Sequence, residues 1–381
     1  MRMLAPFFLL LLTAATTEIR FRAQEIQRDF GVVYAVLIED INGDRKPDIV
    51  AINPTQVVWF ENPSWEKHVV LDGATKKDNV CIAAQDIDGD GMLDLALGAD
   101  WQPTNTTGGG TLQWTGRKGS GPDGFWRLTH IGEEPTLHRI RWGDVDGDGK
   151  NELVVVPLHG RGTQSPKWEG AGARILVYRV PKDPARDPWP VEVADDSLHI
   201  VHNFIVTNLD RDPQSEIITA SREGLFALKR RAGGKWEKTL LGEGSPGEIK
   251  IGRVEGKRYA ATIEPWHGNS VVIYEERSGL WSRQVIEDKL SGAHALGWGD
   301  FDGDGDDELA VGWRQGKFGV AVYKRVRNVG WERALLADDG GMAAEDLAVG
   351  DLNGDSRPEI VAVGRATANV KIYWNVSNKK E

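Results

Sequence analysis

The chain has 381 residues, 46 basic against 57 acidic side chains, a formal net charge of −11 and one cysteine. A single cysteine excludes an internal disulfide. The sequence has no basic run or Lys/Arg stripe, which argues against nucleic acid as a partner.

The N-terminal segment has the features of an export signal. A basic start at Arg2, an apolar run from Leu4 to Leu12 and small residues after it predict a signal peptide over residues 1–16. No other segment is apolar over the about 20 residues that a bilayer span needs. We therefore expect a secreted or periplasmic monomer without a membrane span, with one domain over residues 17–381.

Short apolar strands alternate with turns along this domain. The clearest repeat predicts a first strand over 295–299, an acidic loop, and further strands over 308–313, 319–323 and 331–336. Tryptophan often begins the fourth strand, and we expect these rings to pack between repeats. The apolar third strand recurs at 57–60, 111–114, 175–178, 225–228, 271–274 and 370–373.

An acidic loop follows the first strand in six repeats. The clearest is Asp300-Phe301-Asp302-Gly303-Asp304, completed by Glu308 at position 9. Carboxylates this close repel one another unless a hard cation lies among them, and oxygen ligands at this spacing suit Ca²⁺. Position 12 is Val311, in a strand-like run, so the loop is not an EF-hand. The expected calcium ligands, loop by loop, are Asp40, Asn42, Asp44 and Asp48; Asp86, Asp88, Asp90 and Asp94; Asp144, Asp146, Asp148 and Glu152; Asp210, Asp212 and Glu216 after Asn208; Asp300, Asp302, Asp304 and Glu308; and Asp351, Asn353, Asp355 and Glu359.

These loops also set the repeat count. A seventh copy, the fifth in chain order, begins at Arg253 and has lost its acids, so we expect no metal there. A period near 50 residues with short strands predicts an all-β, seven-bladed propeller. The last repeat lacks a fourth strand, and residues 19–26 could supply it, closing the ring and removing an exposed edge. Without its 21 loop carboxylates the chain would carry a formal charge of +10, so the negative charge is concentrated in the loops.

The D-x-[DN]-G-D-x-x-x-[DE] loops resemble those of the FG-GAP/VCBS repeat family, from about residue 18 to the end. That resemblance implies a β-propeller with Ca²⁺ in its loops. The fourth loop departs from the pattern, with Asn208 at its first position and Arg211 in place of glycine.

Histidines gather on the face opposite the acidic loops. Six of the eight are expected there, namely His138, His159, His199, His202, His267 and His294. The residues six positions before each loop are Tyr34, Val80, His138, His202, Gly247, His294 and Glu345. Equivalent positions on inner strands surround the propeller axis at one height. We therefore expect three imidazoles, Glu345 and Tyr34 around the mouth of the central channel.

This constellation suits elimination chemistry. A neutral imidazole can abstract a proton near neutral pH, an arginine can neutralise a sugar carboxylate, and a tyrosine can protonate the leaving oxygen. The candidate catalytic residues are His138, His202, His294, Tyr34 and Arg139. The candidate substrate-binding residues are His199, His267, Trp266, Arg161, Arg222, Trp313 and Glu345.

Other interpretations remain open. A lone histidine at a strand start is usually structural, and the arginines of the loops are often only solvated. The three imidazoles with Glu345 could also hold an additional metal, since imidazole suits zinc and similar ions.

The His-rich mouth resembles secreted polysaccharide lyase propellers and the aldos-2-ulose dehydratase propeller in architecture and residue types. That resemblance implies a lyase or sugar dehydratase acting on an anionic oligo- or polysaccharide by His-assisted β-elimination. The alternative is a non-catalytic carbohydrate- or protein-binding adhesion propeller, because the fold alone does not decide the function.

Overall fold

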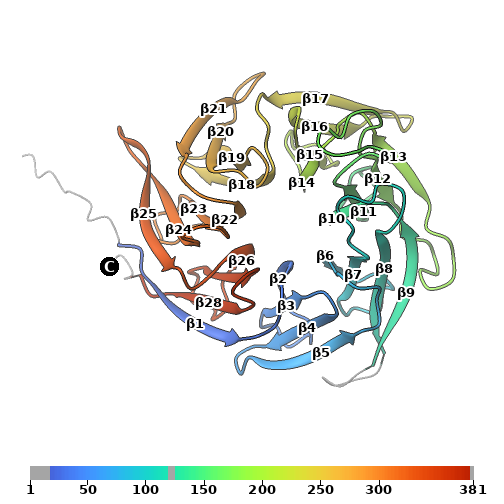
Figure 1. Ribbon diagram of the computed structural model, residues 1–381, viewed down its shortest axis with the longest axis horizontal. Helices are drawn as coiled ribbons and strands as arrows, with labels where there is room; N and C mark the ends of the chain where they lie inside the picture. Colours follow the sequence, from blue (N-terminus) through green and yellow to red (C-terminus); the bar gives the residue numbers. More distant parts are fainter. Residues whose placement is uncertain (1–17, 119–124, 378–381) are drawn as a thin grey trace, which may run out of the picture.

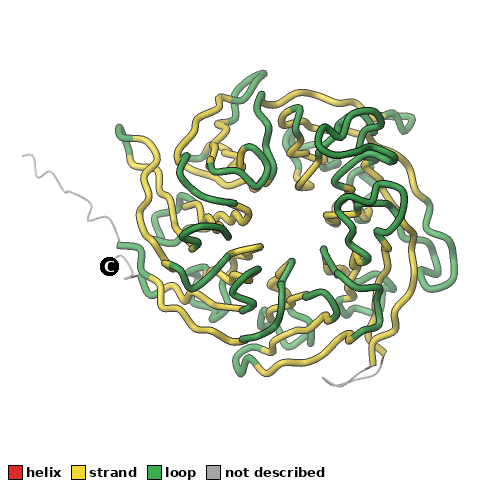
Figure 2. Tube along the Cα trace, viewed as in Figure 1, coloured by secondary structure: helices red, strands yellow, loops and turns green. Residues whose placement is uncertain are grey.

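The computed structural model describes residues 18–118 and 125–377. The expected signal peptide, 1–16, lies outside these residues. Within them, 28 strands and no helices form seven four-stranded antiparallel sheets around a central axis (Figures 1 and 2). The prediction of an all-β, seven-bladed propeller is confirmed. No helical segment among the described residues has the length and hydropathy of a membrane span.

Each blade places its first strand nearest the axis (Figure 1). The first three blades are β2 (Ala35–Glu39), β3 (Asp48–Ile52), β4 (Gln56–Glu61) and β5 (Glu66–Asp72); β6 (Cys81–Gln85), β7 (Asp94–Ala99), β8 (Thr111–Lys118) and β9 (Phe125–Glu133); and β10 (Leu137–Gly143), β11 (Glu152–Pro157), β12 (Ile175–Tyr178) and β13 (Val191–Asp195). The next two are β14 (Val201–Thr207), β15 (Glu216–Ser221), β16 (Gly224–Arg230) and β17 (Trp236–Gly242); and β18 (Glu248–Val254), β19 (Lys257–Glu264), β20 (Ser270–Glu275) and β21 (Ser282–Glu287). The last two are β22 (Ala293–Gly299), β23 (Glu308–Trp313), β24 (Gly319–Val326) and β25 (Gly330–Asp339); and β26 (Ala344–Gly350), β27 (Glu359–Gly364) and β28 (Val370–Asn375) with β1 (Phe21–Gln27).

The first strand of the chain completes the last blade. β1 pairs antiparallel with β28, with Phe21 opposite Asn375 and Gln24 opposite Ile372. Figure 1 shows this N-terminal strand in blue along the outside of the red blade. Without β1, the outer edge of β28 would present unpaired N–H and C=O groups to solvent.

The core lies between neighbouring blades. The second strands β3, β7, β11, β15, β23 and β27 are buried along their whole length, because sheets pack on both of their faces. The expected tryptophan packing is present. Trp331, at the start of β25, contacts Trp298 at a ring distance of 5.7 Å and Tyr259 of the preceding blade at 5.9 Å.

Candidate active site

Three inner strands each bring a histidine to the channel mouth through the same backbone irregularity. His138, His202 and His294 are the second residues of β10, β14 and β22, and each falls where the pairing with the next strand skips one residue. A β-bulge of this kind leaves the extra residue out of the hydrogen-bond ladder and re-aims its side chain. Glu345 occupies the same irregular position in β26.

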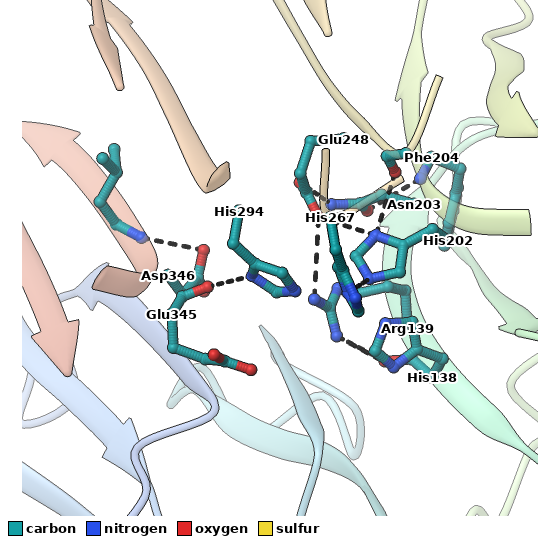
Figure 3. Close-up of polar contacts among 12 residues, drawn as sticks. His138, Arg139, His202, Asn203, Phe204, Glu248, His267, His294, Glu345 and Asp346 are labelled. Carbon is teal, nitrogen blue, oxygen red and sulfur yellow. Dashed lines mark hydrogen bonds and ion pairs between the residues drawn. The ribbon is translucent and has the colours of Figure 1, made fainter. Parts of the chain in front are cut away.

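The bulged histidines converge. The ring centroid of His202 lies 4.6 Å from that of His138 and 5.0 Å from that of His294. All three side chains are buried, with exposed fractions of 6%, 1% and 3% for His138, His202 and His294. Figure 3 shows the rings pointing toward one another from separate strands. The register counted from the sequence therefore places these three rings in one cluster.

A fourth imidazole joins them from a loop. His267 lies between β19 and β20 at a left-handed φ of 56°, and its Nε2 atom is 2.7 Å from Nε2 of His202. Its ring centroid is 4.8 Å from that of His294. The sequence assigned His267 to substrate binding, but its position makes it part of the imidazole cluster itself.

The hydrogen bonds of this cluster orient its nitrogen atoms. His202 Nδ1 donates to the Gly247 carbonyl at 3.1 Å, and His294 Nδ1 donates to the Glu345 carbonyl. A histidine that donates from Nδ1 in its neutral form leaves a lone pair on Nε2. One nitrogen atom from each of His202, His267 and His294 lies within 4.8 Å of the others. This donor set suits a zinc-type ion, because metal-bound histidines usually donate their second N–H to a carbonyl or carboxylate.

The expected fourth metal ligand is engaged elsewhere. The Glu345 carboxylate accepts a hydrogen bond from Arg314 and lies 3.0 Å from the guanidinium of Arg365. Among the nitrogen atoms that converge, His267 therefore stands where the sequence suggested His138 and Glu345. This substitution arises because the β19–β20 loop brings its imidazole in from the side, a contact between two blades that strand register does not encode.

Burial keeps the cluster uncharged. It holds the pKa values of His138, His202 and His294 well below their ordinary range, and the guanidinium groups of Arg139 and Arg314 act in the same direction. Burial and the neighbouring His202 likewise lower the pKa of His267. Neutral imidazoles are the form that accepts protons or binds metals.

His138 differs from the other three. Its Nε2 atom is buried and makes no hydrogen bond, while its Nδ1 atom lies 3.3 Å from Arg139. Arg139 in turn lies 3.8 Å from the Glu248 carboxylate, to which the Asn203 amide also donates. Burial raises the pKa of Glu248. His138 is thus a neutral base whose Nε2 atom has no hydrogen-bond partner.

Aromatic rings form one wall of the site. Trp101 stacks on His138 at 4.6 Å and 20°, and Trp266 lies 5.8 Å from His202 and 4.7 Å from His267. Next to Trp266, His159 stacks on Trp168 at 3.7 Å. The sequence placed Trp266 among the substrate-binding residues and His159 on this face. Trp168 carries no sequence signal, because it lies in a long irregular loop between β11 and β12.

Three expected substrate-binding residues and the expected catalytic Tyr34 lie in other contacts. Arg161 pairs with Glu134 at 2.7 Å. His199 pairs with Glu223 at 2.8 Å, and Arg222 binds the same carboxylate at 3.3 Å. Tyr34 lies beneath the guanidinium of Arg365, 5.7 Å from its ring centroid, and burial raises its pKa.

The expectation that Trp313 offers an open face to a sugar ring is wrong. Trp313 is only 6% exposed and packs in a hydrophobic cluster with Leu296 and Val311. Its indole N–H donates to the Lys317 carbonyl. Trp313 is the last residue of β23. It lies on the same face of the strand as Leu309 and Val311, and that face packs in the core between blades.

The acidic loops share one geometry on the opposite side of the inner strands. In all six, the position-9 carboxylate accepts the backbone N–H of position 2, as Asp48 does from Ile41 at 3.1 Å and Asp94 does from Ile87 at 2.8 Å. The first aspartate accepts N–H groups from within the loop, as Asp300 does from Gly303 and Gly305. The oxygen-rich donor set of the second loop, with the ligand atoms of Asp86, Asp88 and Asp90 within 4.8 Å of one another, fits Ca²⁺.

Comparison with known proteins finds similarity to a dehydratase propeller domain and to FG-GAP-like repeats. Residues 109–277 match the family model for the β-propeller domain of aldos-2-ulose dehydratase, and residues 40–97 match the model for an FG-GAP-like repeat. Aldos-2-ulose dehydratase from Phanerodontia chrysosporium is 29% identical over 236 residues, which cover 53% of this chain and 25% of the relative. The two resemblances expected from the sequence, to FG-GAP repeats and to the dehydratase propeller, are confirmed. The chain spans about a quarter of the length of this relative.

Solved structures match the fold alone. The crystal structure of BBS1N in complex with ARL6DN shares 14% sequence identity at a TM-score of 0.57, covering 96% of this chain and 99% of that one. A protein from Bacteroides fragilis described as a 6-phosphogluconolactonase shares 13% identity at a TM-score of 0.52, covering 93% of this chain and 96% of that one. At such identities neither structure bears on the chemistry of the site.

Proposed function

We propose that this propeller is a secreted or periplasmic sugar dehydratase or lyase that eliminates water or an alkoxide from an anionic sugar at the imidazole cluster. The observation that carries the proposal is the convergence of four buried, neutral imidazoles, one of which, His138, has an outer nitrogen without a partner. A purely structural propeller has no need to bury four titratable rings together. The match to the dehydratase propeller supports the same reaction class.

The reaction requires a base beside an acidic C–H bond. His138 Nε2 takes the proton from the ring carbon next to the carbonyl or carboxylate, and the C–H electrons form the new C=C bond while the C–O bond on the adjacent carbon breaks. Tyr34 donates a proton to the leaving oxygen, and its raised pKa keeps the hydroxyl protonated until that step. The Trp101 and Trp266 rings provide apolar faces for a sugar.

A divalent ion held by His202, His267 and His294 would supply Lewis acidity toward a carbonyl or carboxylate oxygen. Arg139 lies beside His138 and opposes its protonation, which keeps the ring in the neutral form that can accept a proton. The mouth also carries an excess of positive charge, since Arg314 and Arg365 share the single carboxylate of Glu345. The Arg365 side chain is 44% exposed, so it can turn toward the carboxylate of an anionic sugar.

The test is product formation with variants matched in chemistry. The protein, loaded with Zn²⁺ and Ca²⁺, is incubated with 2-keto sugars and with polyuronates, and unsaturated products are followed by ultraviolet absorbance and NMR. We expect an unsaturated product that His138→Gln abolishes and that His130→Gln, on the exposed side of β9, leaves unchanged. The alternative outcome is that the sugars bind but no product forms, and that His138→Gln and His202→Ala leave the binding affinity unchanged. That result would instead establish a non-catalytic binding module.

A further inference from the structure

Two acidic loops contain a lysine ammonium where the repeat pattern places a cation. The residue of the third strand that lies opposite the position-9 carboxylate is set by the strand register. Leu228 pairs with Ile217, so the next residue, Lys229, faces Glu216 in the fourth loop. Tyr323 pairs with Leu309, so Lys324 faces Glu308 in the sixth loop.

Lys229 contacts all three carboxylates of the fourth loop. Its Nζ atom is 2.5 Å from Asp210, 2.5 Å from Asp212 and 2.7 Å from Glu216. Its side chain is 9% exposed. Asn208, at the first position, turns its amide N–H groups toward the Asp212 and Gln214 carbonyls.

Lys324 repeats this arrangement in the sixth loop. Its Nζ atom contacts Asp302 and lies 3.0 Å from Asp304 and 3.6 Å from Glu308. The ligand oxygens of Asp300, Asp302 and Asp304 lie within 4.8 Å of one another, so the loop has the shape of a cation site. A Ca²⁺ ion takes its oxygen ligands at about 2.3–2.6 Å, so it could enter only by displacing the ammonium.

The other loops carry no lysine at this position. Glu61 lies opposite Asp48 in the first loop, Gly116 opposite Asp94 in the second and Trp374 opposite Glu359 in the seventh. In the third loop the equivalent residue, Arg179, contacts the loop only at Asp146, at 3.1 Å, and also reaches Glu192.

Cations inside two other loops do not occupy this position. Lys46 of the first loop and Arg357 of the seventh each contact one carboxylate, that of Asp44 and Asp355 respectively. Among the described residues, these two ion pairs reach neither the first nor the ninth position of either loop.

We infer that Lys229 and Lys324 are built-in replacements for calcium in the fourth and sixth loops, and that Ca²⁺ binding is confined to the first, second, third and seventh loops. A tethered ammonium neutralises part of the loop charge without the entropy cost of capturing a free ion. Ion pairs within the blade therefore replace the expected calcium ligation by Asp210, Asp212, Glu216, Asp302, Asp304 and Glu308. Asp300, expected in the same ligand set, accepts backbone N–H groups of its own loop instead. The fourth and sixth blades depend on lysine for the stabilisation that other blades draw from calcium.

The test counts the Ca²⁺ ions bound to the unaltered protein and to a variant that lacks the Lys324 ammonium. Purified protein is freed of metal with a chelator and titrated with Ca²⁺, and bound calcium is counted by mass spectrometry of the dialysed protein and by calorimetry. We expect four ions per chain for the unaltered protein and five for Lys324→Met, because removal of the ammonium opens the sixth loop. Lys257→Met, which removes an exposed lysine that pairs with Glu275 of β20, should leave the count at four.

Melting in a chelator provides the second readout. Without calcium, Lys324→Met should melt at a lower temperature than the unaltered protein. Added Ca²⁺ should raise the melting temperature of Lys324→Met by more than it raises that of Lys257→Met. Lys324→Gln, refolded in the presence of Ca²⁺, serves if the methionine variant does not fold. Six ions bound to the unaltered protein, or a folded Lys324 variant that gains none, would overturn the inference.

Discussion

The Nε2 atom of His267 lies 2.7 Å from Nε2 of His202, although the two residues come from different blades and are 65 positions apart. Two neutral imidazole nitrogen atoms this close share one proton in a hydrogen bond. His202 already donates from Nδ1 to the Gly247 carbonyl, so its Nε2 atom is the acceptor in a neutral ring. The two nitrogen atoms are therefore joined by a hydrogen bond, and a metal ion that bound both would have to replace the shared proton.

Removal of His267 should remove metal from the cluster. We expect His267→Ala to lower Zn²⁺ affinity at least tenfold, since the chain would lose one of three converging nitrogen ligands. The measurement is competition with a zinc-sensitive dye in protein saturated with Ca²⁺. His68→Ala serves as the matched control, because His68 lies in β5 and pairs with Glu61. Equal zinc affinity in both variants would exclude the cluster as the metal site.

Acid should destabilise the fold through His159. Burial and the Arg222 guanidinium lower the pKa of His159 to about 4, against about 6.5 in an unfolded chain. Between these values the unfolded chain binds a proton that the folded chain excludes, so this stability is fully present above about pH 6.5 and is lost as the pH falls toward 4. At pH 5 the free energy of unfolding is lower by roughly 2 kcal/mol than it is well above pH 6.5.

The test of this pH dependence compares slopes. His159→Gln should show a free energy of unfolding that falls less steeply between pH 6.5 and 4.5, by about one proton, in urea titrations with saturating Ca²⁺. The exposed His130→Gln should retain the original slope. Parallel curves for His159→Gln and the unaltered protein would mean that His159 takes up its proton over the same pH range in the folded and the unfolded chain.

Cys81 should be inert in the native protein. The thiol is buried in β6, and burial raises its pKa to about 12. Since the thiolate is the reactive form, we expect no reaction with a thiol reagent at pH 8 and one reactive thiol per chain after unfolding in guanidinium. Stoichiometric labelling of the native protein within minutes would contradict this expectation, and Cys81→Ser provides the blank.

Phe301 should contribute strongly to stability. It is fully buried at the second position of the sixth loop and makes an edge-to-face contact with Phe21 of β1, at 5.4 Å. Phe301→Ala should lower the free energy of unfolding by about 3–5 kcal/mol, because the cavity lies between the sixth blade and the strand that completes the last one. Phe125→Ala, at a side chain that is 69% exposed, should change it by less than about 0.5 kcal/mol. Similar chemical denaturation curves for the two variants would disprove this role.

Much of the candidate site follows from strand register. Counting six residues back from each acidic loop selected His138, His202 and His294, because the loop anchors one end of each inner strand and the strand rises by a constant distance per residue. Glu345 was found in the same way. The bulges that turn these side chains inward were not evident, since a bulge depends on the pairing of two strands and leaves no mark in the composition of one.

Local patterns in the chain were enough to establish seven repeats, the strand order within each and the residues of the acidic loops, because alternation and turn chemistry act over a few neighbouring residues. Only the tertiary structure decided which side chains meet. It brought His267 to His202, engaged Glu345 with Arg314 and Arg365, buried Trp313 and placed Lys229 and Lys324 among the loop acids. These contacts join different strands or blades, and their partners are selected by packing geometry and charge across space.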